Sequence, residues 1–135
     1  MKLIDVYKHK SSATLLYQLL QEREQHQCIS HKQLPSFIDH LRFIDSKPYQ
    51  AWYLVEQRGT VIGATYLTRQ REIGIFLFKE HQMMGYGAKA VRLLMDTHPG
   101  PFLANIAPTN PGSSEFFQNL GFKLIQHTYQ LGAQK

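Results

Sequence analysis

The stretch from Glu72 to Ala88 limits the fold of this chain more than any other part of its sequence. It begins with the β-rich run 72–78, carries glycines at positions 85 and 87, and continues into residues 86–96, whose apolar side chains recur at helical spacing. This order predicts a buried strand, a tight turn and the start of a helix. Such a helix start directs free backbone N–H groups outward, and these groups together with the helix dipole favour a bound phosphate.

The two glycines also have a simpler explanation, because glycine is a common residue of tight turns. A P-loop is excluded, since no Gly-Lys-Ser/Thr follows, and a dinucleotide fingerprint needs a third glycine where position 90 is Ala. Gln82 is placed to close the turn with its side chain. The turn alone therefore leaves two interpretations open, a phosphate cradle and a plain change of chain direction.

The remaining sequence predicts one mixed α/β domain over residues 1–135. The expected strands are 2–7, 51–56, 61–67, 72–78, 102–107 and 122–131, with a hairpin loop at 57–60, and the expected helices are 12–20, 33–43, 86–96 and 110–120. Residues 21–32 are polar and are expected to form a loop. Ser30 is expected to cap the second helix, with Leu34, Phe37, Ile38 and Leu41 along one helix face. An antiparallel meander that feeds a β-α-β unit favours a mixed sheet with helices on its faces.

Composition narrows the functional classes. The chain has 135 residues, 43% apolar and 19% charged, which is typical of a globular domain with its own core. No window approaches the ~20 apolar residues of a membrane span, and Asp5 interrupts the N-terminus before a signal-peptide core could form. A lone Cys28 excludes an internal disulfide and suits a reducing compartment. We therefore expect a cytoplasmic protein without a membrane partner.

The net charge of +5 favours an anionic partner. Basic residues are scattered singly or in pairs, whereas a nucleic-acid arm would show blocks of five or more like charges. No nucleic-acid partner is expected, and a phosphorylated small molecule remains the favoured anion.

Two motifs on these elements resemble the GNAT family of acyl-CoA-dependent N-acetyltransferases. The family's pyrophosphate loop reads Gln/Arg-x-x-Gly-x-Gly/Ala after its fourth strand, and Gln82-Met83-Met84-Gly85-Tyr86-Gly87 fits every fixed position. Downstream, the family has Asn, a small residue three positions later, an aromatic at seven and Gly-Phe at eleven. Asn110, Ser113, Phe117 and Gly121-Phe122 occupy these positions. The resemblance runs from about residue 50 to the C-terminus.

The resemblance implies an α+β fold in which four helices flank a mostly antiparallel sheet of six or seven strands. Its central parallel pair, at 72–78 and 102–107, would splay apart to admit acetyl-CoA as cosubstrate. Pantetheine would bind like an added strand along the backbone of Phe76, Leu77 and Phe78. The remaining residues that the resemblance implies for cofactor binding are Gln82, Met83, Met84, Gly85, Tyr86, Gly87 and Ala88 at the pyrophosphate, and Asn110, Ser113 and Phe117 beside the pantetheine arm.

The implied reaction is attack of an unprotonated primary amine on the thioester. Glu72 is the expected base, and Asn105 is expected to bind or orient the acceptor. A backbone N–H near Leu77 or Phe78 would stabilise the thioester oxygen, and no metal is required. Position 117 departs from the family, since Phe replaces the Tyr that often serves as general acid. The segment 122–131 suffices for one long strand where the family ends in two, so a neighbouring subunit could supply the last strand in a homodimer.

Three acceptor hypotheses stay open at this point. The first is a small-molecule amine such as an amino sugar or polyamine. The second is a protein N-terminus or lysine side chain. The third is a non-catalytic module that binds acyl-CoA, which the missing Tyr at position 117 motivates.

Overall fold

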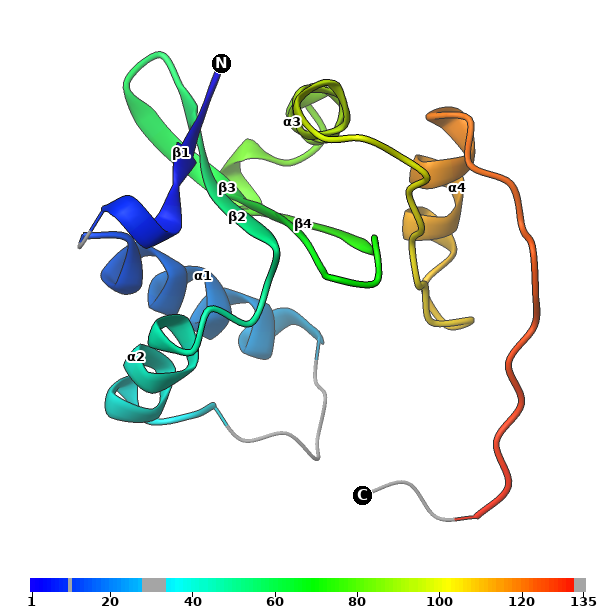
Figure 1. The fold of residues 1–135 in the computed structure, drawn as a ribbon, viewed down its shortest axis with the longest axis horizontal. Coiled ribbons are helices and arrows are strands. Elements are labelled where there is room, and N and C mark those ends of the chain that lie inside the picture. The colour runs from blue at the N-terminus through cyan, green and yellow to red at the C-terminus, as the bar shows by residue number, and fades with distance from the viewer. Residues whose placement is uncertain (10, 28–33, 133–135) are drawn as a thin grey trace.

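Four antiparallel strands form one sheet in the order β1-β2-β3-β4 (Figure 1). They are β1 (Lys2–Asp5), β2 (Ala51–Gln57), β3 (Thr60–Leu67) and β4 (Ile73–Leu77) in the computed structural model, which describes residues 1–9, 11–27 and 34–132. β2 and β3 form a hairpin whose turn holds Arg58 and Gly59 at positive φ. The meander expected between residues 51 and 78 is confirmed.

Helices cover both faces of this sheet. α1 (Ser12–Gln27) and α2 (Phe37–Asp45) lie on one face, α3 (Tyr86–Thr97) lies on the other, and α4 (Pro111–Asn119) stands past the end of β4 (Figure 1). Two short 3-10 helices, η1 (Val6–Lys8) and η2 (Lys79–His81), follow β1 and β4. The combination of four helices with an antiparallel sheet confirms the mixed α and β class.

Each face of the sheet has its own apolar core, because successive strand residues point to opposite faces. On the first face Leu19 of α1 packs in one cluster with Trp52 of β2. On the second face Leu94 of α3 packs with Leu67 of β3, and Phe117 of α4 belongs to the same cluster. This double burial explains why β2 and β3 read as nearly continuous apolar runs.

Both N-terminal helices differ from the expected boundaries. α1 continues to Gln27 instead of ending near residue 20, since the polar residues after Leu20 include several strong helix formers. α2 begins at Phe37 and not at residue 33, because Pro35 restricts the residue before it to extended geometry. Ser36 caps α2 by accepting from the backbone N–H of Asp39 at 3.1 Å, whereas the expected cap, Ser30, lies outside the described residues.

The buried face of α2 is also not the expected one. Phe37, Ile38 and Leu41 are exposed, with Ile38 at 61%, while His40 and Ile44 are the buried residues of the helix. One helical turn separates His40 from Ile44, so both face the sheet side. The apolar periodicity therefore predicted a helix correctly and its buried face wrongly.

The expected six or seven strands are wrong, since the described residues form four. Segment 102–107 makes one parallel bridge, Glu72 with Leu103, and then leaves β4, so the parallel pair of strands is not formed. Segment 122–131 runs as an extended exposed chain without strand pairing. Gly121 does end α4 at positive φ, and the backbone N–H of Phe122 returns to the Phe117 carbonyl at 3.0 Å.

Candidate active site

The turn before α3 leaves the helix N-terminus open. Gly85 precedes the helix at φ 78° and no side chain caps the first turn. The first backbone N–H groups of a helix have no partner within the helix, so those of Tyr86, Gly87 and Ala88 are directed toward the turn. A Cβ on Gly85 would meet no heavy atom within 4 Å, so there is open space beside these donors. The arrangement suits an anion at the helix N-terminus.

Gln82 closes this turn as the sequence predicts. Its side-chain Nε2 donates to the carbonyl oxygen of Leu77 at 3.0 Å, which ties the turn to the end of β4. Met83, at φ 66°, and Met84 project from the turn and are strongly exposed. The side chain of Gln82 thus has a structural task, and the backbone of the turn remains available to a ligand.

Gly87 differs in role from Gly85. It lies inside α3 and is buried, and a Cβ there would come within 3.2 Å of the Phe116 ring. The expected positive φ is found at Gly85 and not at Gly87. Gly87 therefore allows α3 and α4 to approach each other, so a bulky replacement would disturb packing before it blocked a ligand.

The outer edge of β4 distinguishes between the two expected oxyanion donors. The backbone N–H of Phe78 donates to the Ile62 carbonyl of β3 at 2.9 Å and is occupied. Backbone groups alternate between the two edges of a strand, so Ile75 and Leu77 point away from β3. At the N-terminal end of this edge the N–H of Ile73 pairs with Leu103 at 2.8 Å. Leu77, and not Phe78, is the available N–H.

Glu72 and Asn105, 33 residues apart, are in direct contact. The Asn105 side-chain amide donates to one carboxylate oxygen of Glu72, and the Thr68 hydroxyl donates to the other at 3.3 Å. The Thr68 hydroxyl also accepts from the Glu72 backbone N–H at 3.0 Å. The parallel bridge at Leu103 brings segment 102–107 to this point. The carboxylate is thereby held at the start of β4.

The downstream motif lies on α4 and is mainly structural in the described chain. Asn110 caps the helix by accepting from the Ser113 backbone N–H at 3.1 Å. Phe117 is only 7% exposed and packs edge-to-face against Phe116 and Phe122. Little of the Phe117 ring is therefore available to a ligand.

An apolar cavity of about 480 Å³ lies between α1, α2 and the first face of the sheet. Its aromatic walls include Tyr49, Trp52, Tyr66 and Phe76. Burial, followed by the neighbouring Tyr66 hydroxyl, raises the pKa of Tyr49 to about 12, and burial also raises the pKa of Tyr66. Both phenols are neutral near pH 7. Of these residues the sequence singled out Trp52, and alternation with Trp52 in the paired strand could have indicated Tyr66.

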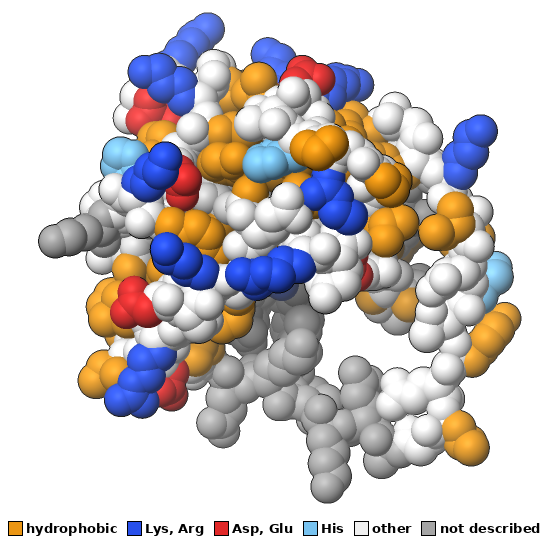
Figure 2. All heavy atoms as spheres, in the orientation of Figure 1, with side chains coloured by type: hydrophobic (Ala, Val, Ile, Leu, Met, Phe, Trp, Pro, Cys, Tyr) orange, Lys and Arg blue, Asp and Glu red, His pale blue; other side chains and the backbone are white. Residues whose placement is uncertain are grey.

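Charge is spread over the molecule and not gathered into one stripe. Figure 2 shows Lys and Arg side chains at separate points of the visible face. No group of three or more His, Cys, Asp or Glu side chains in the part of the chain that the structure describes could hold a metal ion. None of the helices among these residues is long and apolar enough to cross a membrane.

Residues 7–123 match the family model described as acetyltransferase (GNAT) domain. The chain belongs to this family. The match includes the open N-terminus of α3, the β4 edge and the contact between Glu72 and Asn105. No curated protein matches the chain by sequence.

Solved structures of GNAT-type enzymes share the fold of this GNAT chain. YncA of Salmonella typhimurium, solved with its cofactor acetyl-CoA, has a TM-score of 0.75 at 18% identity, covering 99% of this chain and 87% of YncA. A spermidine N-acetyltransferase chimera from Vibrio cholerae and hSSAT gives 0.75 at 18%, covering 94% and 83%. A ribosomal-protein-alanine N-acetyltransferase from Brucella melitensis gives 0.70 at 14%, covering 91% and 85%. At these identities the likeness shows the fold, and the named acceptors differ between neighbours.

Proposed function

We propose that this GNAT protein transfers the acetyl group of acetyl-CoA to the primary amine of a small molecule. The observation that carries the proposal is the open N-terminus of α3 beside the outer edge of β4. The family membership and the acetyl-CoA in the YncA structure support the choice of donor. The contact between Glu72 and Asn105 supports a reactive centre on the same strand.

The residues present fit acetyl-CoA. The backbone of Met83–Ala88 would hold the pyrophosphate, since N–H groups at a helix N-terminus and the helix dipole both favour negative charge. The outward backbone groups of Ile75 and Leu77 would pair with the pantetheine amides as an added strand does. Asn110 and Ser113 remain proposed contacts of the pantetheine arm, through groups that the cap of α4 leaves available.

The proposed reaction divides three tasks among the residues. The Glu72 carboxylate takes a proton from the acceptor ammonium, which frees the nitrogen lone pair, while Asn105 orients the carboxylate and the amine. The Leu77 backbone N–H donates to the thioester oxygen as the N–C bond forms and charge develops on that oxygen. The C–S bond then breaks. The sulfur leaves as a thiolate that water protonates, because Phe117 has no proton to give and a thiol pKa near ~8.5 makes the thiolate a fair leaving group.

A thiol-release assay tests this proposal. The full chain is incubated with acetyl-CoA and each member of a panel of primary amines, and the free thiol of CoA is measured together with the mass of the acetylated amine. We expect amine-dependent thiol release for at least one member, at a kcat of about 1 s⁻¹ or more. Acetyl-CoA without an amine is the control for hydrolysis. Binding of acetyl-CoA without turnover of any amine would contradict catalysis and favour the non-catalytic module.

A protein acceptor is the second candidate, which the ribosomal-protein-alanine N-acetyltransferase neighbour favours. Peptides with free N-termini and with lysine side chains therefore belong in the panel. Acetylation of peptides at a kcat/KM well above that of every small amine would replace the first proposal with the second. A cytoplasmic location stays a proposal that rests on the lone Cys28.

We also propose a homodimer that forms through the C-terminal arm, defined as residues 123–131. The arm runs apart from the other elements (Figure 1), and Leu124, Ile125 and Tyr129 are 72%, 73% and 89% exposed. An extended segment with exposed apolar side chains and unpaired backbone groups favours pairing with a second strand. Light scattering of the full chain is expected to give twice the mass of one chain, and Ile125→Ser should lower it. A mass of one chain at micromolar concentration would contradict the dimer.

A further inference from the structure

The cavity between α1, α2 and the sheet lies on the same sheet face as Glu72. Its wall includes Phe76 of β4, and the side chains of Glu72, Gly74 and Phe76 alternate onto one face of that strand. The Glu72 charge is also near enough to act on the Tyr66 phenol. One end of the cavity is therefore close to the proposed base. Its volume of about 480 Å³ is within the range of small-molecule sites.

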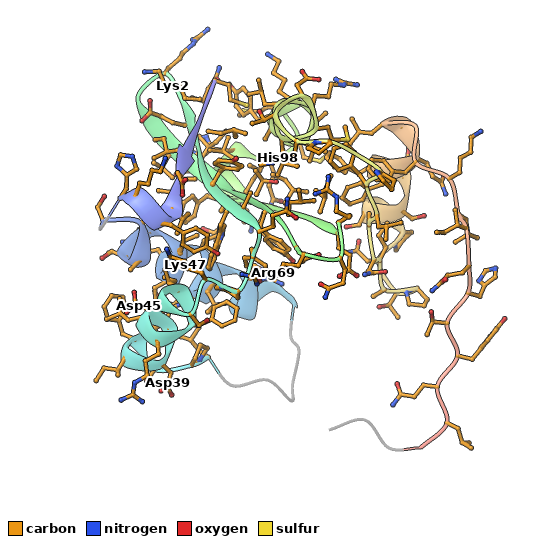
Figure 3. All side chains as sticks on the ribbon, in the orientation of Figure 1. Lys2, Asp39, Asp45, Lys47, Arg69 and His98 are labelled. Carbon is orange, nitrogen blue, oxygen red and sulfur yellow. The ribbon has the colours of Figure 1, made fainter. Side chains whose placement is uncertain are left out.

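Packed aromatic rings give the middle of the cavity a fixed shape. Tyr49 stacks on Tyr66 with ring centroids 4.0 Å apart and meets Trp52 edge-to-face at 4.8 Å. A Cβ on Gly74 would overlap the Tyr66 ring, so the glycine makes room for this stack. Arg69 holds the chain before Tyr49 by donating to the Lys47 and Pro48 carbonyls, each at 2.9 Å (Figure 3). These contacts suit a flat, uncharged ring between the walls.

His40 of α2 supplies an unsatisfied hydrogen-bonding atom to this cavity. The residue is only 5% exposed, lines the cavity, and donates from one ring nitrogen to the Ala13 carbonyl. Its Nε2 is buried and has no hydrogen-bond partner among the described residues, so the bond to Ala13 uses Nδ1. Burial lowers the pKa of His40, so the ring is neutral near pH 7 and Nε2 is an acceptor. A buried acceptor without a donor is destabilising unless a ligand satisfies it.

The charges on the cavity wall do not suit a polycation. The guanidinium of Arg23 lies 3.7 Å from the Phe76 ring centroid, so a positive charge is already present beside β4. Asp39 is the acidic residue of the wall, and it pairs with Arg42 at 3.6 Å on the exposed side of α2. Several ammonium groups would need several carboxylates when removed from water.

We infer that the cavity binds the acceptor, and that the acceptor is a primary amine on an uncharged aromatic ring whose far end donates a hydrogen bond to His40 Nε2. The inference rests on the proposed acetyl transfer and names the substrate class for it. The amine lies toward Glu72 on β4, the ring lies beside Tyr49, Trp52 and Tyr66, and the donor group meets α2.

Four amines test the inference in the thiol-release assay: 4-hydroxyphenethylamine, phenethylamine, spermidine and glucosamine. We expect kcat/KM for 4-hydroxyphenethylamine to exceed that for phenethylamine by about tenfold, because only the first donates to His40. Both should exceed spermidine and glucosamine by about a hundredfold. Trp52 is the only tryptophan of the chain, so its fluorescence gives a second readout of binding that needs no turnover.

Two substitutions of His40 separate the cavity contact from the contact with α1. His40→Asn keeps a donor near the Nδ1 position for the Ala13 carbonyl and removes Nε2, so the tenfold preference for the hydroxylated amine should fall toward one. His40→Gln restores a polar group near the Nε2 position and should recover part of the preference. His98→Asn is the matched control, since His98 bonds to Tyr53 at 2.7 Å outside this cavity and its loss should leave the preference unchanged.

The outcomes distinguish the two levels of the argument. Equal use of both phenethylamines, or a preference that survives in His40→Asn, would overturn the role of His40. Spermidine, glucosamine or a peptide as the best acceptor would overturn the substrate class while acetyl transfer stands. No turnover of any amine would remove the proposed function itself, and Trp52 fluorescence would then show whether the cavity binds aromatic amines at all.

Discussion

Replacing Glu72 with glutamine is expected to lower kcat by about 10²–10³-fold, in the range that a positioned general base contributes. Glutamine has the same length and can still meet Asn105 and Thr68, but it cannot accept the proton of the acceptor ammonium. The affinity for acetyl-CoA should change less than about twofold, because the expected phosphate contacts come from the α3 turn. Steady-state kinetics and calorimetry with CoA measure the two effects separately.

The pH dependence makes this test sharper. Without the carboxylate, Glu72→Gln depends on amine that is already deprotonated in water, and that fraction rises about tenfold per pH unit below an amine pKa near ~10. The deficit of the variant should therefore shrink as the pH rises from 7 to 9. Glu115→Gln on the exposed side of α4 is the matched control and should behave like the unchanged protein. A kcat for Glu72→Gln within twofold of that protein would exclude Glu72 as the base.

Replacing Gly85 with aspartate should weaken CoA binding by about tenfold or more relative to replacement with asparagine. The two side chains have the same shape, both tolerate positive φ better than other residues, and a Cβ at this position meets nothing within 4 Å. They differ by one negative charge placed beside the expected pyrophosphate, where partial burial keeps the repulsion strong. Calorimetry with CoA at low and high salt measures the difference.

The two Gly85 variants should unfold at nearly the same temperature, because both carry the same backbone strain. An aspartate at a helix N-terminus interacts favourably with the helix dipole, so Gly85→Asp should be at least as stable as Gly85→Asn. Their difference in CoA affinity should decrease at high salt as the charges are screened. Equal affinities at low salt would mean that no diphosphate binds at the N-terminus of α3.

Local signals in the sequence predicted much of the centre of this chain. The meander up to β4, the Gln82 closure, the start of α3 and the Asn110 cap all depend on residues within a few positions of one another. Such features are decided by turn chemistry and capping, which short segments carry by themselves. The expected contact region of Glu72 and Asn105 also holds, although no local rule says that residues 33 positions apart must touch.

The boundaries of the N-terminal helices required weights that periodicity does not supply. Residues 21–27 were expected to form a loop because they are polar, yet polarity on an exposed surface is compatible with helix. In α2 the apolar side chains of Phe37, Ile38 and Leu41 stay exposed, while the polar His40 is buried. Which face of a helix is buried depends on what it packs against, and the partner of α2 is 10 or more residues away in sequence.

By itself, the sequence determined the family, the strand–turn–helix junction and the chemistry of the residues along β4, because these depend on spacing within one continuous segment. Tertiary structure alone decided that Leu77 and not Phe78 offers a free N–H, that Gly87 serves packing with Phe116, and that His40 faces an aromatic cavity. Each of these outcomes depends on a neighbour from another element. Hydrogen-bond partners and buried faces belong to pairs of elements, and the pairing exists only in the folded chain.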